Sequence, residues 1–275
     1  MTYTAIEFDV DAPLATITLN RPEKRNALNH DLLNDIVAAL EVVADDDAIK
    51  VAIIKANGPA FSAGFDLDGS PYISIPEGEK SWNVTSGHKH QRKMRKIYES
   101  IWDNPKVVIA QVHGHALAGG MYLSMLCDMV VAADDALIGE PFMRLGGASS
   151  MPFWYWLVGP RRATDMLFNG RVLTGVEAED WGLVTRSVPL EDLETTVREM
   201  AQSIAEAPLE SILSKKEMWH TQADLLGWGA QFRYTTSLNS WLRMANPEPQ
   251  AGESGMKQMM RDRKDRIARG EGSDY

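Results

Sequence analysis

Apolar and polar positions alternate with two different periods along the first two thirds of the chain. Residues 4–8 and 14–19 form short runs on either side of a turn at 11–13, and the second run alternates as a strand does. They predict a β-hairpin at the start of the chain. Apolar residues then recur at helical spacing between positions 33 and 43, which predicts a helix ending near Asp45.

Either Asn29 or Asp31 is suited to cap the N-terminus of this helix. The alternation of strands and helices continues beyond it. The expected elements that follow are a strand at 50–56, a helix near 91–102, a strand at 107–112, a helix at 119–127 and a strand at 129–132. Strands that alternate with helices through short connections indicate an α/β fold. Its strands are expected to be mainly parallel, with ligand sites at their ends.

From residue 190 onward the pattern is helical throughout. The expected helices cover residues 190–207, 208–220, 225–245 and about 255–269. A run of helices without a sheet must cover an existing core or pack on another subunit. We therefore expect a core of residues 1–190 and a helical C-terminal region of residues 191–275 that serves oligomerisation.

Composition narrows the classes of function. With 275 residues, 44% hydrophobic and 24% charged, the chain has the size and usage of an ordinary globular enzyme. Its net charge of -10 argues against broad binding of nucleic acid or an anionic membrane, so an anionic ligand needs a local basic patch. The single cysteine, Cys127, excludes an internal disulfide and favours a reducing compartment. With no signal peptide recognised, we expect a cytoplasmic protein.

Two glycine-rich segments follow predicted strands. They are AFSAGFDLDG, residues 60–69, and GHALAGGMYLSMLCD, residues 114–128, which enters a helix through Gly119 and Gly120. Glycines at a helix N-terminus leave backbone N–H groups uncovered, where the helix dipole also favours negative charge. The second segment therefore indicates an anion site, or else glycines kept only for close packing of strand and helix. Residues 69–87 are either a lid over a site or a surface loop without function.

Four segments together resemble the signatures of the crotonase (enoyl-CoA hydratase/isomerase) family. They are NRPEKRNAL at 20–28, FSAGFDL at 61–67, PKVVIAQVHGHALAGGMYLSMLCDMVVAADDALIG at 105–139 and EAEDWGLVTRSVP at 177–189. The resemblance implies an α/β fold with a ββα-repeat spiral core and a helical C-terminal region, assembled as a homotrimer or a dimer of trimers. It implies an acyl-CoA substrate, with coenzyme A entering as part of the thioester and no separate cofactor or metal.

Members of this family bind the thioester carbonyl oxygen between two backbone N–H groups, at positions that match Phe65 and Gly119. Such fixed donors act best on charge that develops in the transition state, and one is typically worth about 3–4 kcal/mol. Lys24 matches a position that contacts the CoA nucleotide. The other positions expected to bind substrate or CoA are Ala63, Gly64, Asp66, Leu67, Gly120 and Phe142.

The sequence departs from the family where hydratases carry two glutamates that place and deprotonate water. Tyr122 and Phe142 occupy those positions, and Ser150 stands where some isomerases and the 4-chlorobenzoyl-CoA dehalogenases carry an acid. Acid/base catalysis contributes about 10²–10⁴-fold, so ordinary hydration and dehalogenation are not expected. Tyr122 is either a proton donor or part of the pocket wall. Glu140 either takes over an acid's position or is a structural or surface residue.

Phe65, Tyr122 and Phe142, with the aromatic run at 153–156, predict a pocket for a bulky, cyclic or aromatic acyl group. The run at 153–156 can equally pack in the core or at a subunit interface. One hypothesis is an acyl-CoA enzyme that performs isomerisation, hydrolysis, C–C cleavage, decarboxylation or a specialised hydration. The alternative is an acyl-CoA-binding protein that has kept the two N–H donors and lost turnover.

Overall fold

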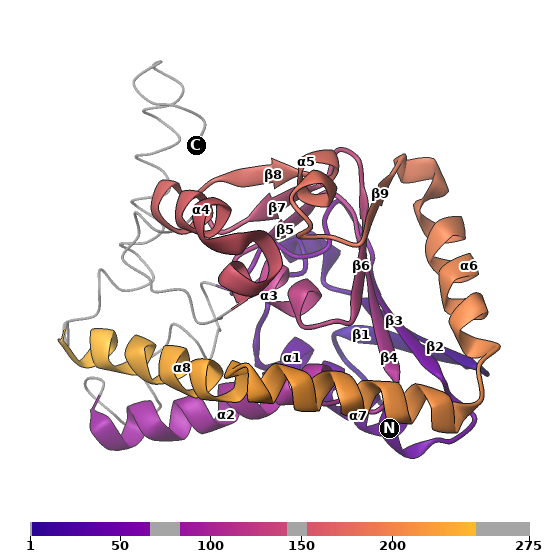
Figure 1. Ribbon diagram of the computed structural model, residues 1–275, viewed down its shortest axis with the longest axis horizontal. Helices are drawn as coiled ribbons and strands as arrows, with labels where there is room; N and C mark the ends of the chain where they lie inside the picture. The colour runs from indigo at the N-terminus through magenta and orange to yellow at the C-terminus, as the bar shows by residue number, and fades with distance from the viewer. Residues whose placement is uncertain (1, 67–82, 142–152, 246–275) are drawn as a thin grey trace.

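Strands and helices alternate along the computed structural model, which describes residues 2–66, 83–141 and 153–245 (Figure 1). The strands are β1 (Ile6–Asp11), β2 (Leu14–Leu19), β3 (Val51–Ala56), β4 (Val107–Val112), β5 (His115–Leu117), β6 (Met129–Ala133), β7 (Leu137–Gly139), β8 (Val172–Thr174) and β9 (Arg186–Val188). The helices are α1 (His30–Asp45), α2 (Val84–Trp102), α3 (Gly119–Met125), α4 (Phe153–Asn169), α5 (Gly175–Asp180), α6 (Leu193–Ala205), α7 (Leu209–Leu225) and α8 (Trp228–Ala245), with 3-10 turns η1 (Pro22–Lys24) and η3 (Leu190–Asp192). The expected α/β class is confirmed.

The main sheet has six strands in the order β1-β2-β3-β4-β6-β9. β1 and β2 form the expected antiparallel hairpin, with Ile6 opposite Leu19 and Asp11 opposite Leu14. All further neighbours in this sheet are parallel, as the alternation of elements predicts. The core strands β3 and β4 are almost entirely buried, because elements pack on both faces of the sheet.

A second sheet, in the order β5-β7-β8, is not predicted from the sequence. Each of its strands has three residues, which is too short for an alternating pattern to show. β7 pairs in parallel with β5 and antiparallel with β8. Because β5 leads directly into α3, this small sheet fixes where α3 begins.

Helices cover both sides of the main sheet. α6 packs on β2, β3, β4 and β6, and Figure 1 shows α3 and the small sheet on the opposite side. α2, α7 and α8 pack against one another, with Trp102 of α2 stacked on Trp228 of α8 at 4.2 Å between ring centroids. Within the described ranges, residues after β9 contain only helices and 3-10 turns, as expected, while the helix expected at 255–269 lies outside those ranges.

α2 begins seven residues earlier than the hydrophobic pattern predicts. Asn83 caps it through a capping box, accepting from Ser86 N–H at 2.9 Å while its own N–H donates to Ser86 Oγ at 2.9 Å. The first turns are polar, so no apolar period marks them. Of the expected lid at 69–87, residues 83–87 are described and belong to the cap and first turn of α2; residues 67–82 lie outside the described ranges.

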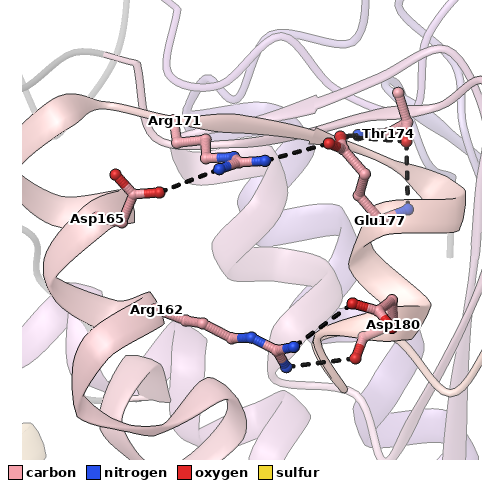
Figure 2. Close-up of polar contacts among 6 residues, drawn as sticks. All are labelled: Arg162, Asp165, Arg171, Thr174, Glu177 and Asp180. Atoms are coloured by element: carbon pink, nitrogen blue, oxygen red, sulfur yellow. Dashed lines mark hydrogen bonds and ion pairs between the residues drawn. The ribbon is translucent and has the colours of Figure 1, made fainter.

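α4 and α5 are tied together by ion pairs (Figure 2). Arg171 reaches Asp165 of α4 at 3.3 Å and Glu177 of α5 at 3.2 Å, and Arg162 reaches Asp180 at 3.4 Å. The short strand β8 lies between these two helices in the chain and pairs with β7. None of the helices in the described part of the chain is both long and apolar enough to cross a lipid bilayer.

Candidate active site

The first glycine segment is hydrogen-bonded on one side to the chain before α1. Leu28 N–H donates to Gly64 O at 2.8 Å, and Asp66 N–H donates to Leu28 O at 3.0 Å. This is a parallel bridge between Leu28 and Phe65. In such a bridge the N–H and C=O of the central residue point away from the partner. The N–H of Phe65 therefore points away from Leu28.

The other side of the same segment faces β5 and the start of α3. Ser62 bridges to Ala116, so the backbone groups of Ser62 point toward β5. Gly64, at φ +102°, permits the close approach: a β-carbon there would lie 2.9 Å from Leu117 O and 3.6 Å from Gly119 N.

The second glycine segment turns sharply at Ala118. This residue has φ +46° and ψ -115°, which is unusual for a residue with a β-carbon. Its N–H donates to Gly139 O at 2.9 Å, which holds the turn against β7. Gly119 is then the first residue of α3, so its N–H has no acceptor within the helix. Elsewhere in the described parts of the chain no hydrogen bond from this N–H is found either.

Both glycines at the start of α3 are also needed for packing. A β-carbon on Gly119 would lie 2.8 Å from the Phe65 ring, and one on Gly120 would lie 2.4 Å from Ser62 O. A role in an anion site and a role in close packing are therefore compatible for these glycines. Gly120 serves close packing of α3 on the first glycine segment, while Gly119 places its N–H beside Phe65.

Tyr122 and Glu140 meet beside this point. Tyr122, one turn into α3, is buried, and its hydroxyl donates a hydrogen bond to Glu140 Oε1. Its ring lies 6.4 Å from that of Phe65, at an interplanar angle of 58°. Glu140 directly follows β7, and the pairing of Leu117 with Gly139 sets it next to the start of α3. The structure thus brings together Phe65, Gly119, Tyr122 and Glu140 from three separate segments.

Basic residues gather at the turn η1, before the first glycine segment. Lys24 and Arg25 are exposed there. Arg21, in contrast, is largely buried and forms an ion pair with Asp66 at 2.9 Å. Ala63 N–H donates to Arg25 O at 2.9 Å, which ties the segment to this basic turn. Asp66 therefore uses its carboxylate to hold the local structure.

Comparison with known proteins decides the family. Residues 9–240 match the family model described as enoyl-CoA hydratase/isomerase. The chain belongs to this family. It is 32% identical over 243 residues to the putative enoyl-CoA hydratase EchA13 of Mycobacterium tuberculosis, covering 83% of this chain and 76% of that protein. It is 31% identical over 198 residues to 4-chlorobenzoyl coenzyme A dehalogenase-1 of Arthrobacter sp, covering 71% and 70%.

Solved structures of the enoyl-CoA hydratase/isomerase family share the fold. The crystal structure of a probable enoyl-CoA hydratase from Mycobacterium thermoresistibile has a TM-score of 0.79 and 31% identity, covering 88% of this chain and 97% of that one. An enoyl-CoA hydratase/isomerase from Xanthobacter autotrophicus Py2 has a TM-score of 0.86 and 27% identity, covering 96% and 99%. The expected crotonase-like fold with a helical C-terminal region is confirmed.

Some expected site positions of this family member lie outside the described residues: Leu67, Phe142 and Ser150. The aromatic run at 153–156 divides between two environments. Trp154 is buried in the core, whereas Tyr155 is 63% exposed. Trp154 therefore packs in the core, as the alternative to a pocket wall expects, and Tyr155 lies at the surface of the chain.

Sequence reasoning missed the scaffold that holds the first glycine segment. Asn26 is fully buried, and its amide donates to Asn57 O and Ala60 O, both at 2.8 Å. Ser62 Oγ donates to Asn26 O at 2.7 Å. The signal available was a polar residue enclosed in the NRPEKRNAL motif, because buried amides in such turns usually bond to backbone groups. This scaffold fixes where Phe65 lies.

Within the described ranges, His113 and Cys127 hold structural positions. Among the residues of these ranges no group of three or more histidine, cysteine, aspartate and glutamate side chains has the arrangement of a metal site. His113 uses its Nε2 for a 2.8 Å contact with Gly58 O. Cys127 is buried, and this burial raises the pKa of its thiol, so that it remains protonated.

Proposed function

We propose that this chain binds an acyl-CoA thioester and stabilises negative charge on its carbonyl oxygen through the N–H groups of Phe65 and Gly119. The observation that carries the proposal is how closely the segments approach: a β-carbon on Gly64 would lie 3.6 Å from Gly119 N, and one on Gly119 would lie 2.8 Å from the Phe65 ring. The two amides come from separate segments. One is turned away from Leu28 by a parallel bridge and the other begins a helix. Donors fixed before the reaction need no reorganisation when charge develops.

Three further features support an acyl-CoA substrate. Lys24 is exposed at η1, next to the first glycine segment, where a cation suits the CoA nucleotide. Ala63 and Gly64 lead from this turn to Phe65, and we propose that the adenine and pantetheine parts of CoA lie along them. The rings of Phe65 and Tyr122 form an aromatic wall that suits a bulky or cyclic acyl group. Coenzyme A enters as part of the substrate, without a separate cofactor.

The proposal covers reactions that pass through a thioester enolate or oxyanion: isomerisation, hydrolysis, C–C cleavage, decarboxylation or a specialised hydration. Ordinary hydration is the least favoured of the family's reactions, because Tyr122 and Phe142 stand where hydratases carry their two glutamates. We also propose that the chain acts as a homotrimer or a dimer of trimers.

The carbonyl stretch of bound thioester tests the two N–H donors directly. Phenylacetyl-CoA labelled with ¹³C at the carbonyl should show this infrared band at lower frequency on the protein than in water, because two donors weaken the C=O bond. Gly119→Pro removes one donor and should lose much of the shift. Gly119→Ala is the matched control, since it adds a β-carbon against Phe65 but keeps the N–H.

Two outcomes would contradict the proposal. The first is a folded chain that binds no CoA thioester in calorimetry. The second is a Gly119→Pro variant that binds the thioester with the carbonyl band at the wild-type frequency, as Gly119→Ala also does. Binding with a shifted band, but no product from a panel of cyclic and aromatic acyl-CoAs, would instead support the acyl-CoA-binding alternative.

A further inference from the structure

We propose that Tyr122 and Glu140 form a proton relay that acts on the carbon next to the thioester carbonyl. The inference rests on the proposed function, since the relay needs the thioester carbonyl to be held at Phe65 and Gly119. It goes further by assigning the proton transfer to two residues and by naming the class of acyl group they suit.

The register of the small sheet places the relay. Leu117 pairs with Gly139, and Ala118 N–H donates to Gly139 O at 2.9 Å, so Glu140 is the first residue beyond the pairing. It therefore emerges beside the N-terminus of α3. Tyr122 lies in the first turn of α3, where side chains lean toward the helix N-terminus. The phenol of Tyr122 and the carboxylate of Glu140 thus meet on the side of the helix where Gly119 begins.

The contacts tie this pair to the proposed oxyanion site. The Phe65 ring lies 6.4 Å from the Tyr122 ring, and the same Phe65 ring would touch a β-carbon on Gly119 at 2.8 Å. When the Phe65 and Gly119 amides hold the thioester oxygen, the α-carbon of the acyl group therefore lies in the region lined by Tyr122. Tyr122 is 3% exposed, so this region is screened from bulk water on the side of the phenol.

A direct phenol–carboxylate contact differs from the arrangement of two glutamates around a water. The Tyr122 hydroxyl bonds to Glu140 itself, so no water separates the two groups. In a buried site of low dielectric, a carboxylate that accepts the phenol proton allows the phenol oxygen to take a proton from the group that it faces. The pair is therefore suited to move a proton to and from carbon, and less suited to deliver hydroxide.

The step balances without any other reactant. The phenol oxygen of Tyr122 takes the proton from the α-carbon as its own proton passes to Glu140. The C–H electron pair becomes the C=C bond of the enolate, and the carbonyl π pair moves to the oxygen held by the two N–H groups. When the proton held by the pair is first replaced by one from solvent, its return to the same carbon gives exchange with solvent hydrogen, whereas return to the γ-carbon of a 3-enoyl group shifts the double bond.

The chemistry indicates which acyl groups fit. The α-hydrogen must be acidified by a neighbouring π system, since a phenol–carboxylate pair is a modest base. The flat rings of Phe65 and Tyr122 favour a planar group at that place. We therefore expect arylacetyl-CoA or 3-enoyl-CoA thioesters, in which an aryl ring or an alkene lies next to the α-carbon.

Exchange of hydrogen at the α-carbon of phenylacetyl-CoA isolates this step. This thioester can neither be hydrated nor isomerised, so in D₂O the wild type should catalyse loss of one methylene proton in ¹H NMR, with the second proton exchanging more slowly because the relay lies on one side. Tyr122→Phe and Glu140→Gln should each lower the rate by about 10²–10⁴-fold. Matched controls are Tyr3→Phe, which keeps the ring contact with Phe8, and Glu194→Gln on the exposed side of α6.

A pH profile separates a relay from a structural role for Glu140. In the wild type, exchange should fall at low pH as the Glu140 carboxylate is protonated. Glu140→Gln should abolish this acid limb, and Glu140→Asp should restore part of the rate together with the limb. A residue that only supported the fold would change the rate without removing the limb.

The outcomes distinguish this inference from the proposed function. Wild-type rates of exchange in Tyr122→Phe or Glu140→Gln would overturn the relay, while the shifted carbonyl band would still support the oxyanion site. The relay is also wrong if the wild type binds phenylacetyl-CoA with a shifted band but neither exchanges its α-hydrogens nor isomerises a 3-enoyl-CoA. Failure to bind any CoA thioester would remove both proposals together.

Discussion

At the scale of single residues, the backbone of Ala118 directs the helix that begins at Gly119. Its positive φ is sparsely populated by residues with a β-carbon, and such conformations cost on the order of 1–3 kcal/mol. The bond from its N–H to Gly139 O holds it there. The strained turn is therefore maintained by the small sheet and sets the direction of the Gly119 N–H.

Ala118 gives the first prediction. Ala118→Val should lower the free energy of unfolding by about 1–3 kcal/mol, because a β-branched side chain fits poorly at positive φ. Ala118→Gly should be neutral or slightly stabilising, since glycine adopts this conformation freely. Urea denaturation checks both variants. Equal stability of the valine and glycine variants would show that the backbone turn carries no strain.

The residues at the two hydratase positions give the second prediction. With Tyr122 and Phe142 in place of glutamates, crotonyl-CoA should be hydrated at least about 10²-fold more slowly than by a family member that carries both acids. The loss of enone absorbance measures this rate. A shift of the carbonyl infrared band on binding shows that the thioester has reached the site. Rapid hydration would show that another group activates water.

At the scale of elements, a buried ion pair fastens α7 to the sheet. Lys216 Nζ lies 2.7 Å from Asp128 Oδ1 and 2.9 Å from Oδ2, and both side chains are largely buried. Asp128 also accepts from Val108 N–H of β4 at 2.8 Å. The pair therefore connects the C-terminal helices to the centre of the parallel sheet.

Breaking this pair gives the third prediction. Lys216→Met should destabilise the fold by about 3–5 kcal/mol, because it leaves the Asp128 carboxylate buried without its cation. Combining it with Asp128→Asn should recover part of the loss, since no charge then remains buried. Lys55→Met, which removes the partner of the exposed Glu194, is the control and should cost at most about 1 kcal/mol. Urea denaturation gives all three values, and a Lys216 effect no larger than the control would contradict the prediction.

The C-terminus of α2 gives the fourth prediction. Partial burial raises the pKa of Asp103 to about 6, with further contributions from Glu99 and Asp224 that Lys216 opposes. The folded chain therefore binds more protons than the unfolded chain between roughly pH 4 and 6. Stability falls as pH rises through this window.

Asp103→Asn removes this dependence and should stabilise the chain at pH 7.5 but not at pH 4. The gain should stay below about 1 kcal/mol, because the side chain is partly exposed and solvent screens it. Asp135→Asn, at an exposed turn, changes the net charge equally and serves as the control. Thermal denaturation at both pH values measures the difference, and a gain of equal size at pH 4 would contradict the assignment.

At the scale of the whole molecule, the C-terminal helices expose apolar side chains. Met218 is 56% exposed and Leu225 is 82% exposed, and these residues, seven positions apart on α7, share one helix face. Contiguous exposed apolar residues commonly mark a contact between subunits. This observation supports the proposed homotrimer or dimer of trimers.

Oligomeric state gives the fifth prediction. Light scattering should report about 92 kDa for three chains of 30.6 kDa, or about twice that for six. The double variant Met218→Glu with Leu225→Glu should shift the mass toward the single chain, because it places charge on the apolar face. Val10→Glu, at another exposed apolar residue on β1, is the control. A monomeric wild type would show the proposed assembly wrong.

The sequence by itself determined the class of fold and most of its long elements. The hairpin, α1, β3, β4, α3 and β6 follow from hydrophobic period and capping, which are local properties of the chain. Through the family resemblance of its motifs it also predicts Phe65 and Gly119 as the two N–H donors, which stays a prediction. The short strands β5, β7, β8 and β9 were missed, because three residues carry too little pattern and their pairing depends on segments far away in the chain.

Only the tertiary structure decided what the site residues do to one another. The sequence left Tyr122 as a proton donor or a wall residue and Glu140 as a catalytic or surface glutamate. The register of β5 and β7 joins them by a hydrogen bond. The tertiary structure likewise pairs the largely buried Arg21 with Asp66. Such pairings are set by packing between distant segments, and no local pattern encodes them.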